Sequence, residues 1–122
     1  MSIAICEDSM IEYQQLVAMI DASGVSCAYE RFETGAAFLA QFYPGKYDFI
    51  LMDIYMEGLT GVKTVSRLRE RDDNVPVAFI TTSLDHAMDG YRLRVGHYLH
   101  KPLKRSEVEE ALRFAVQEKK RR

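Results

Sequence analysis

Short apolar runs alternate along the chain with longer segments whose apolar residues recur at helical spacing. The expected strands, in chain order, are Ser2–Cys6, Val25–Phe32, Tyr47–Met52, Val75–Thr81 and His97–His100. The expected helices are Met10–Ile20, Thr34–Phe42, Val62–Arg71, Leu84–Leu93 and Ser106–Lys119. Strict alternation of strand and helix predicts an α/β fold, with a parallel sheet covered by helices on both faces and joined by right-handed crossovers.

The apolar pattern also indicates where individual elements lie and begin. Tyr47–Met52 and Val75–Thr81 are almost continuously apolar, which is typical of strands covered on both faces, whereas Val25–Phe32 alternates as a strand near an edge does. Asp8 or Ser9 is expected to cap the first helix. Ser106 is expected to be the N-cap of the last helix, with Glu109 completing a capping box.

Length and composition indicate one domain over residues 1–122. A hydrophobic fraction of 48% can fill a single core, and a formal net charge of -2 gives no electrostatic reason for this domain to contact nucleic acid. The first residues are too few and too acidic for a signal peptide, and no apolar stretch is long enough to cross a membrane. We therefore expect a cytoplasmic location without membrane contact. The final residues "QEKKRR" are expected to begin a linker to an output domain beyond residue 122.

Both cysteines lie in apolar, strand-like runs. Cys6 and Cys27 are expected to be free thiols in a reducing compartment. A disulfide between two neighbouring strands is the less favoured alternative.

Polar groups follow four of the predicted strands, at the point where each strand ends. They are Glu7 and Asp8, then Asp53, Thr81 and Lys101. Because the carboxyl ends of parallel strands meet in one crevice, we expect these side chains to lie close together. Taken singly, each has an ordinary structural explanation as a helix cap, a strand end or a turn. The prediction of a site depends on all four strand ends carrying compatible chemistry.

The carboxylates in this set predict a site for a hard divalent cation. Glu7, Asp8 and Asp53 supply carboxylate oxygens, and the backbone carbonyl of Tyr55 could supply a further one. Mg²⁺ takes oxygen ligands and keeps several waters, so it is the expected ion, and Mn²⁺ could substitute for it.

Asp53 is the expected nucleophile, because a carboxylate can accept a phosphoryl group and form an acyl phosphate. A bound cation would offset the repulsion between this carboxylate and an anionic phosphodonor. Lys101 would pair with Asp53 at rest and with a phosphoryl oxygen after transfer, while the Thr81 hydroxyl would donate to another oxygen. The Lys101–Pro102 bond can be cis or trans, and the sequence does not decide between them.

Four segments that carry these groups resemble the receiver domain of two-component response regulators. They are "ICEDS", "FILMDIYMEGLTG", "PVAFITT" and "GHYLHKP", and they are spread over nearly the whole chain. The resemblance implies a flavodoxin-like, doubly wound fold with five parallel strands in the order 2-1-3-4-5 and five helices.

The resemblance also implies roles for individual residues. Asp53 would be phosphorylated by a sensor histidine kinase, with Mg²⁺ bound by Glu7, Asp8 and Asp53. Thr81 would be the switch hydroxyl, Lys101 the lysine of the family motif, and Tyr98 the aromatic switch residue. Such a domain catalyses its own phosphorylation and dephosphorylation and is not an enzyme with ordinary turnover.

The segments "DIYMEG" and "HYLHKP" are most similar to LytTR-type regulators, whose receivers precede a DNA-binding domain. This similarity implies control of transcription through the chain's own output domain. Phosphorylation would remodel the surface formed by the segments Leu84–Leu93, His97–His100 and Ser106–Lys119. That surface is expected to act as a docking face or as the interface of a homodimer that forms on phosphorylation.

Two positions depart from the family pattern. Glu57 stands where the family usually has proline, which adds negative charge near the site, and Thr82 stands where many members have alanine. Bulky Tyr55 is expected to shield the acyl phosphate from water.

Three alternatives remain. The first is an interaction module with the same fold that works without phosphorylation. The second, a flavin-binding electron carrier, would need a Ser/Thr/Gly-rich loop where "CEDSM" stands. The third, a haloacid-dehalogenase-type phosphatase, would need an aspartate where Tyr55 stands.

Overall fold

A computed structural model describes residues 1–83 and 85–122 of the protein. Its strands are β1 (Ser2–Cys6), β2 (Ala28–Phe32), β3 (Phe49–Asp53), β4 (Val77–Thr81) and β5 (His97–His100). Its helices are α1 (Met10–Ala22), α2 (Gly35–Gln41), α3 (Gly61–Arg69), α4 (Ala87–Arg92) and α5 (Arg105–Arg121). Leu84, where the fourth expected helix begins, lies outside the described residues.

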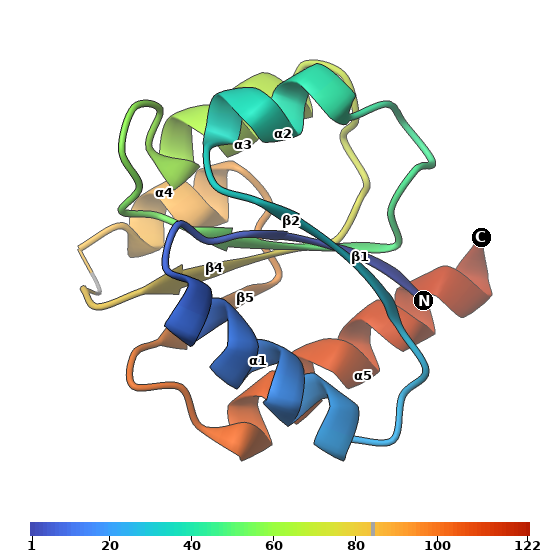
Figure 1. Cartoon of the computed structure of the whole chain (residues 1–122). Coiled ribbons are helices and arrows are strands. Elements are labelled where there is room, and N and C mark those ends of the chain that lie inside the picture. Colours follow the sequence, from blue (N-terminus) through green and yellow to red (C-terminus); the bar gives the residue numbers. More distant parts are fainter. Residues whose placement is uncertain (84) are drawn as a thin grey trace.

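The strands form one parallel sheet in the order β2-β1-β3-β4-β5. Helices α1 and α5 cover one face and helices α2, α3 and α4 cover the other, as Figure 1 shows. The predicted fold class and strand order are therefore confirmed. Because β1 lies between β2 and β3 and the chain changes winding direction there, the loops after β1 and β3 meet beside each other, as in other doubly wound sheets.

Alternate residues of the central strands pack into two separate hydrophobic cores, one on each face of the sheet. In β3, Ile50 and Met52 pack with the cluster beneath α2 and α3, whereas Phe49 and Leu51 pack with the cluster beneath α1 and α5. All five residues of β3 and all five of β4 are buried. The edge strand β2 alternates between exposed and partly buried positions, as predicted.

Five elements begin further along the chain than the sequence indicates: β2, β3, β4, α2 and α4. Strand β2 begins at Ala28, which pairs with Ser2, the first residue of β1, so the residues before it have no neighbouring strand to join. Strand β4 begins at Val77, after Pro76, which has no N–H to give to a ladder. Helix α4 begins at Ala87.

Helix α1 is capped by one of the two expected residues. The Ser9 hydroxyl accepts a hydrogen bond from the Glu12 N–H at 3.3 Å, so Ser9 and not Asp8 is the cap. The predicted capping box of the last helix is wrong. Helix α5 begins one residue earlier, because the Lys104 carbonyl accepts from Val108 N at 3.1 Å. The Glu109 carboxylate instead accepts from Arg105 Nε at 3.0 Å.

The two ends of the chain meet at Asp48. The carboxylate of Asp48 accepts from the Ser2 N–H at 2.8 Å and lies 3.1 Å from Lys119 Nζ and 3.4 Å from an Arg122 nitrogen. Helix α5 runs to Arg121, so all but the last of the residues "QEKKRR" are helical. Cys6 is buried and Cys27 partly buried, and both are free thiols, as expected. In the described part of the chain, every helix is too short or too polar to span a bilayer.

Gly61 allows the first turn of α3 to approach the end of β3. Its N–H donates to the Ile54 carbonyl at 2.8 Å, and a Cβ at this position would lie 2.3 Å from the Asp53 carbonyl oxygen. That distance is much shorter than a van der Waals contact. The Asp53 carbonyl cannot move away, because it belongs to the backbone of β3. A side chain at residue 61 would therefore push apart β3 and α3 beside Asp53.

We expect Gly61→Ala to lower the free energy of unfolding by about 2 kcal/mol or more, because the methyl group overlaps fixed backbone. Gly90→Ala is the matched control. A Cβ at Gly90 would make ordinary contact, at 3.6 Å from the nearest Tyr98 carbon, and alanine favours the helix by about 1 kcal/mol. Urea denaturation of both variants checks this. Equal stabilities for the two variants would contradict the steric argument.

Candidate functional site

The polar residues that follow the strands converge at the carboxyl edge of the sheet. Asp53 is the last residue of β3, Thr81 is the last of β4, and Glu7 follows β1. Asp53 and Glu7 are only 3% and 2% exposed, and Thr81 is fully buried, whereas Asp8 is exposed. The structure thus brings together the groups that the sequence placed in one crevice.

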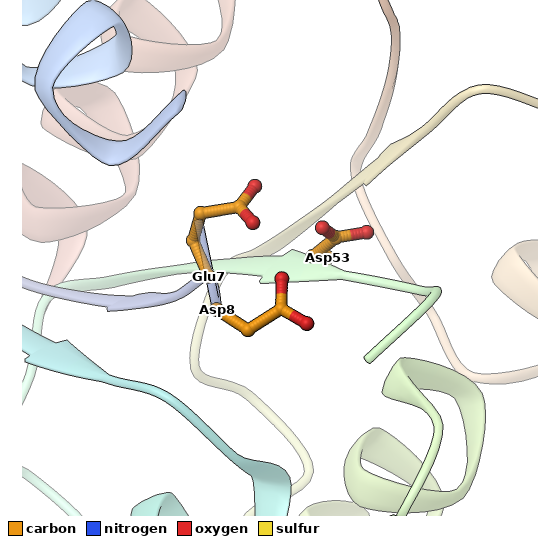
Figure 2. Close-up of side chains that lie close together, drawn as sticks. All are labelled: Glu7, Asp8 and Asp53. Atoms are coloured by element: carbon orange, nitrogen blue, oxygen red, sulfur yellow. The ribbon is translucent and has the colours of Figure 1, made fainter. Parts of the chain in front are cut away.

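Glu7, Asp8 and Asp53 form an acidic cluster. One carboxylate oxygen from each lies within 4.8 Å of the others, and Figure 2 shows the three side chains at the ends of neighbouring elements. A set of three carboxylates this close fits a hard divalent cation, which prefers oxygen ligands and neutralises their mutual repulsion. These three residues are therefore the ones that could hold Mg²⁺.

Arg31 on the edge strand β2 fixes the backbone that carries two of these acids. Its Nε donates to the Glu7 carbonyl at 3.2 Å, and another of its nitrogens donates to the Asp8 carbonyl at 3.0 Å. The Glu7 N–H donates to the Phe32 carbonyl at 3.0 Å, and a Glu7 carboxylate oxygen accepts from the Ser9 N–H at 3.1 Å. The loop after β1 is thus held from both sides.

Lys101 brings a cation into the acidic cluster. Its Nζ lies 3.0 Å from Asp53 Oδ2, 3.1 Å from Glu7 Oε1 and 3.0 Å from Glu12 Oε1. Its backbone N–H donates to the Thr81 carbonyl at 2.7 Å, and the Lys101–Pro102 peptide bond is cis. The predicted pairing of Lys101 with Asp53 at rest is present.

The pKa values of this cluster follow from burial and charge. Burial alone would lower the pKa of Lys101, but its hydrogen bonds to Glu12 and Asp53 outweigh burial and raise that pKa above its usual range. Burial raises the pKa of Glu7, and the charge of Asp53 adds to this effect, although the Ser9 N–H and Lys101 oppose it. The charged form of Glu7 is therefore disfavoured where it lies, buried beside a second carboxylate.

The Asp53 carboxylate is oriented by the residue two positions later. Its Oδ1 accepts from the Tyr55 N–H at 3.0 Å, while its Oδ2 accepts from Lys101. The Tyr55 side chain is 47% exposed and its hydroxyl lies 3.1 Å from His86 Nε2. Tyr55 therefore contacts Asp53 through its backbone and His86 through its side chain.

Thr81 and Tyr98 lie further along the same edge. The Thr81 hydroxyl oxygen accepts from the Ser83 N–H at 3.1 Å. The Tyr98 hydroxyl donates to the Ser83 carbonyl at 2.9 Å, and its half-buried ring packs edge-on against Phe79. The hydrogen bonds of Thr81 and Tyr98 thus reach the same residue of the segment after β4.

A groove of about 790 Å³ opens beside the cluster, between α1 and the segment that follows β5. Both Glu7 and Lys101 line it, together with Leu16, Met19, Thr82 and Leu103.

Two residues that depart from the family pattern, Glu57 and Thr82, are exposed at this edge. Neither replaces a member of the acidic cluster.

Sequence reasoning missed three residues of the site: Glu12, Arg31 and His86. Glu12 is explained equally well as an acid in the first turn of a helix, where the helix dipole favours it. Arg31 is an ordinary charged residue of an edge strand. His86 and Tyr55 are 31 positions apart in the sequence, so no local pattern predicts their contact.

Comparisons with known proteins place this site in a family. Residues 3–113 match the family described as "Response regulator receiver domain". The chain is 36% identical over 70 residues to the positive alginate biosynthesis regulatory protein of Pseudomonas aeruginosa, which covers 57% of the chain and 28% of that protein. It is 30% identical over 108 residues to the DNA-binding transcriptional regulator NtrC of Escherichia coli, which covers 87% of the chain and 22% of that protein. The chain thus spans about a quarter of the length of these relatives.

Solved structures show the same fold. The response regulatory domain of MrkE from Klebsiella pneumoniae superposes with a TM-score of 0.90 at 24% identity, covering 100% of both chains. The receiver domain of a sensor histidine kinase from Pseudomonas aeruginosa, whose structure has a magnesium ion coordinated in its active site cleft, superposes with a TM-score of 0.82 at 22% identity, covering 95% of this chain and 97% of that one. With a family match over nearly all its length and an acidic cluster at the expected strand ends, the chain belongs to the response regulator receiver domain family.

Proposed function

We propose that Asp53 accepts a phosphoryl group from a phosphohistidine of a sensor histidine kinase, in a reaction that depends on Mg²⁺. The observation that carries the proposal is the placement of Asp53. It is buried at the end of β3, 3.0 Å from the Lys101 ammonium, and is a member of a cluster of three carboxylates. In the transfer, a carboxylate oxygen of Asp53 forms a bond to phosphorus while the bond from phosphorus to the imidazole nitrogen breaks, and the imidazole keeps that electron pair.

The surrounding residues have roles that follow from their positions. Glu7, Asp8 and Asp53, with the Tyr55 carbonyl, would hold Mg²⁺, which when bound neutralises charge on the transferring phosphoryl oxygens. Lys101, already hydrogen-bonded to Asp53, would exchange that carboxylate for a phosphoryl oxygen. The Thr81 hydroxyl would donate to another phosphoryl oxygen. Mn²⁺ would support the same chemistry.

The phosphoryl group would then change the surface formed by α4, β5 and α5. Movement of Thr81 toward it would open space into which Tyr98 can turn, which requires breaking the 2.9 Å hydrogen bond from Tyr98 to the Ser83 carbonyl. Met88 and Tyr91, two large apolar residues of α4, are 77% and 83% exposed. Exposed apolar side chains on this surface support its use in a homodimer that forms on phosphorylation.

The output would be control of transcription in the cytoplasm, through a DNA-binding domain of the LytTR type beyond residue 122. The motif "DIYMEG" supports this assignment, as does the greater length of relatives that are named regulators. The receiver itself would contact neither nucleic acid nor membrane. An interaction module that works without phosphorylation is the alternative, and the first experiment below separates the two.

The decisive experiment is intact-mass spectrometry after incubation with acetyl phosphate and Mg²⁺. We expect wild-type protein to gain the mass of one phosphoryl group and Asp53→Asn to gain none, because the amide cannot act as the nucleophile. Omission of Mg²⁺ is expected to suppress the gain. A wild type that stays as unmodified as Asp53→Asn would favour the interaction module.

Mg²⁺ binding predicts a gain in stability that depends on Asp8. At a concentration 100 times the dissociation constant, the ion is expected to raise the free energy of unfolding by about 2.7 kcal/mol. Because Asp8 is exposed, Asp8→Asn is expected to fold normally and to lose most of this gain. Glu110→Gln, which changes an exposed acid on α5, is the matched control and should keep it. Thermal unfolding with and without Mg²⁺ checks this, and an equal gain in both variants would contradict the assignment of Asp8.

Tyr55 is expected to lengthen the life of the acyl phosphate, because its exposed ring belongs to the residue whose N–H bonds to Asp53 and would limit the access of water. Tyr55→Ala should therefore accelerate loss of the phosphoryl group severalfold after the phosphodonor is removed. Tyr43→Ala removes another exposed tyrosine, from the segment after α2, and should leave the rate unchanged. If Tyr55→Ala decays no faster than the wild type, the shielding role is rejected.

A further inference from the structure

His86 lies between the phosphoacceptor loop and helix α4. It directly precedes α4, and its ring is packed edge-on against the Tyr55 ring, with centroids 5.6 Å apart. His86 Nε2 lies 3.1 Å from the Tyr55 hydroxyl oxygen. The residue two positions after Asp53 is thus joined through its side chain to the start of α4.

The second ring nitrogen of His86 faces a carboxylate of helix α4. His86 Nδ1 lies 3.1 Å from Asp89 Oδ2, and the other Asp89 oxygen accepts from Arg92 at 3.3 Å. The hydrogen bond from His86 holds the pKa of Asp89 below its usual value, and the nearby Arg92 acts in the same direction. Since an ionised carboxylate only accepts, Nδ1 carries the proton, and in the neutral imidazole Nε2 accepts from the Tyr55 hydroxyl.

The backbone of His86 reaches the other aromatic residue of the site. Its N–H donates to the Tyr98 hydroxyl at 3.3 Å, and that hydroxyl donates to the Ser83 carbonyl. His86 therefore contacts both Tyr55 and Tyr98. This makes it the point where the edge of the site and the start of α4 are connected.

Tyr55 is held at two points. Its N–H donates to Asp53 Oδ1 at 3.0 Å and its hydroxyl bonds to His86. Because the side chain is 47% exposed, little packing restricts its rotamer, and the contact with His86 fixes where the ring lies. Loss of that contact would release the ring while leaving the backbone hydrogen bond to Asp53 in place.

We propose that His86 is a positioning residue for Tyr55, holding its ring beside Asp53 and so slowing hydrolysis of the acyl phosphate. The inference rests on the proposed phosphorylation of Asp53 and deepens it by adding a regulatory contact. Because His86 belongs to the start of α4, a displacement of that helix would change the lifetime of the phosphoryl group. A hydrogen bond accessible to solvent biases such an arrangement by about two- to tenfold.

The step that this contact controls is hydrolysis. The oxygen of a water molecule forms a bond to phosphorus, and the bond from phosphorus to the Asp53 oxygen breaks, with Asp53 keeping the electron pair. The water gives up one proton to solvent, and inorganic phosphate leaves. The ring of Tyr55 takes no part in these bond changes and acts by occupying the approach of the water.

The test compares loss of the phosphoryl group in the wild type and in five variants. Protein is phosphorylated with acetyl phosphate and Mg²⁺, the donor is removed, and the remaining acyl phosphate is followed by intact mass. We expect His86→Ala and Tyr55→Phe each to accelerate the loss by about two- to tenfold, since each removes the same hydrogen bond. The double variant should decay no faster than either single one, because residues that act through one contact are not additive.

Rescue separates positioning from a general structural effect. His86→Gln keeps an amide group near the place of Nε2, so it should restore much of the slow decay that His86→Ala loses. Tyr43→Phe, which removes a hydroxyl from another exposed tyrosine, should decay as the wild type does.

Normal uptake of the phosphoryl group with unchanged decay in His86→Ala and Tyr55→Phe would overturn this inference alone. Effects that multiply in the double variant would also overturn it. A wild type that takes up no phosphoryl group would overturn the proposed function together with it.

Discussion

The ammonium of Lys101 offsets the repulsion between the acidic side chains at the carboxyl edge of the sheet. Glu7 and Asp53 are both almost fully buried at the ends of the neighbouring strands β1 and β3, so their charges repel each other where water screens them poorly. Lys101 lies within 3.1 Å of both. One cation cannot compensate the two buried acids and the adjoining Asp8 and Glu12. A divalent cation would neutralise the negative charge that Lys101 leaves uncompensated.

Most of the fold could be predicted because it depends on local patterns. The runs at Ser2–Cys6 and His97–His100 coincide with the observed strands, and the alternation of strands and helices fixes a parallel sheet. Where the predicted bounds of an element are wrong, contacts with a neighbouring segment determine where that element begins. The residues before Ala28 are strand-like in sequence, but β1 offers them no partner. The capping box at Ser106 failed because the Lys104 carbonyl already accepts the first helical hydrogen bond.

The residues of the site also fall into those that could be predicted from the sequence and those that could not. Asp53, Thr81 and Lys101 could be predicted to converge, because a residue at a strand end is placed by the backbone of the sheet. Glu12 and Arg31 reach the site through long side chains from a helix and an edge strand. Their direction depends on packing between elements, and many other charged residues of this chain have the same local surroundings. Nothing in the sequence distinguishes them.

Tyr55 connects Asp53 to residues outside the sheet through hydrogen bonds. Strands β3 and β4 are buried throughout and packed on both faces, so displacing them would disturb both cores. The contacts that lead from Asp53 through Tyr55 and His86 lie instead in partly exposed segments. Such segments rearrange at low free-energy cost. The proposed phosphorylation of Asp53 would therefore act outward most easily through the surrounding loops, and helix α4 is the element that those loops contact.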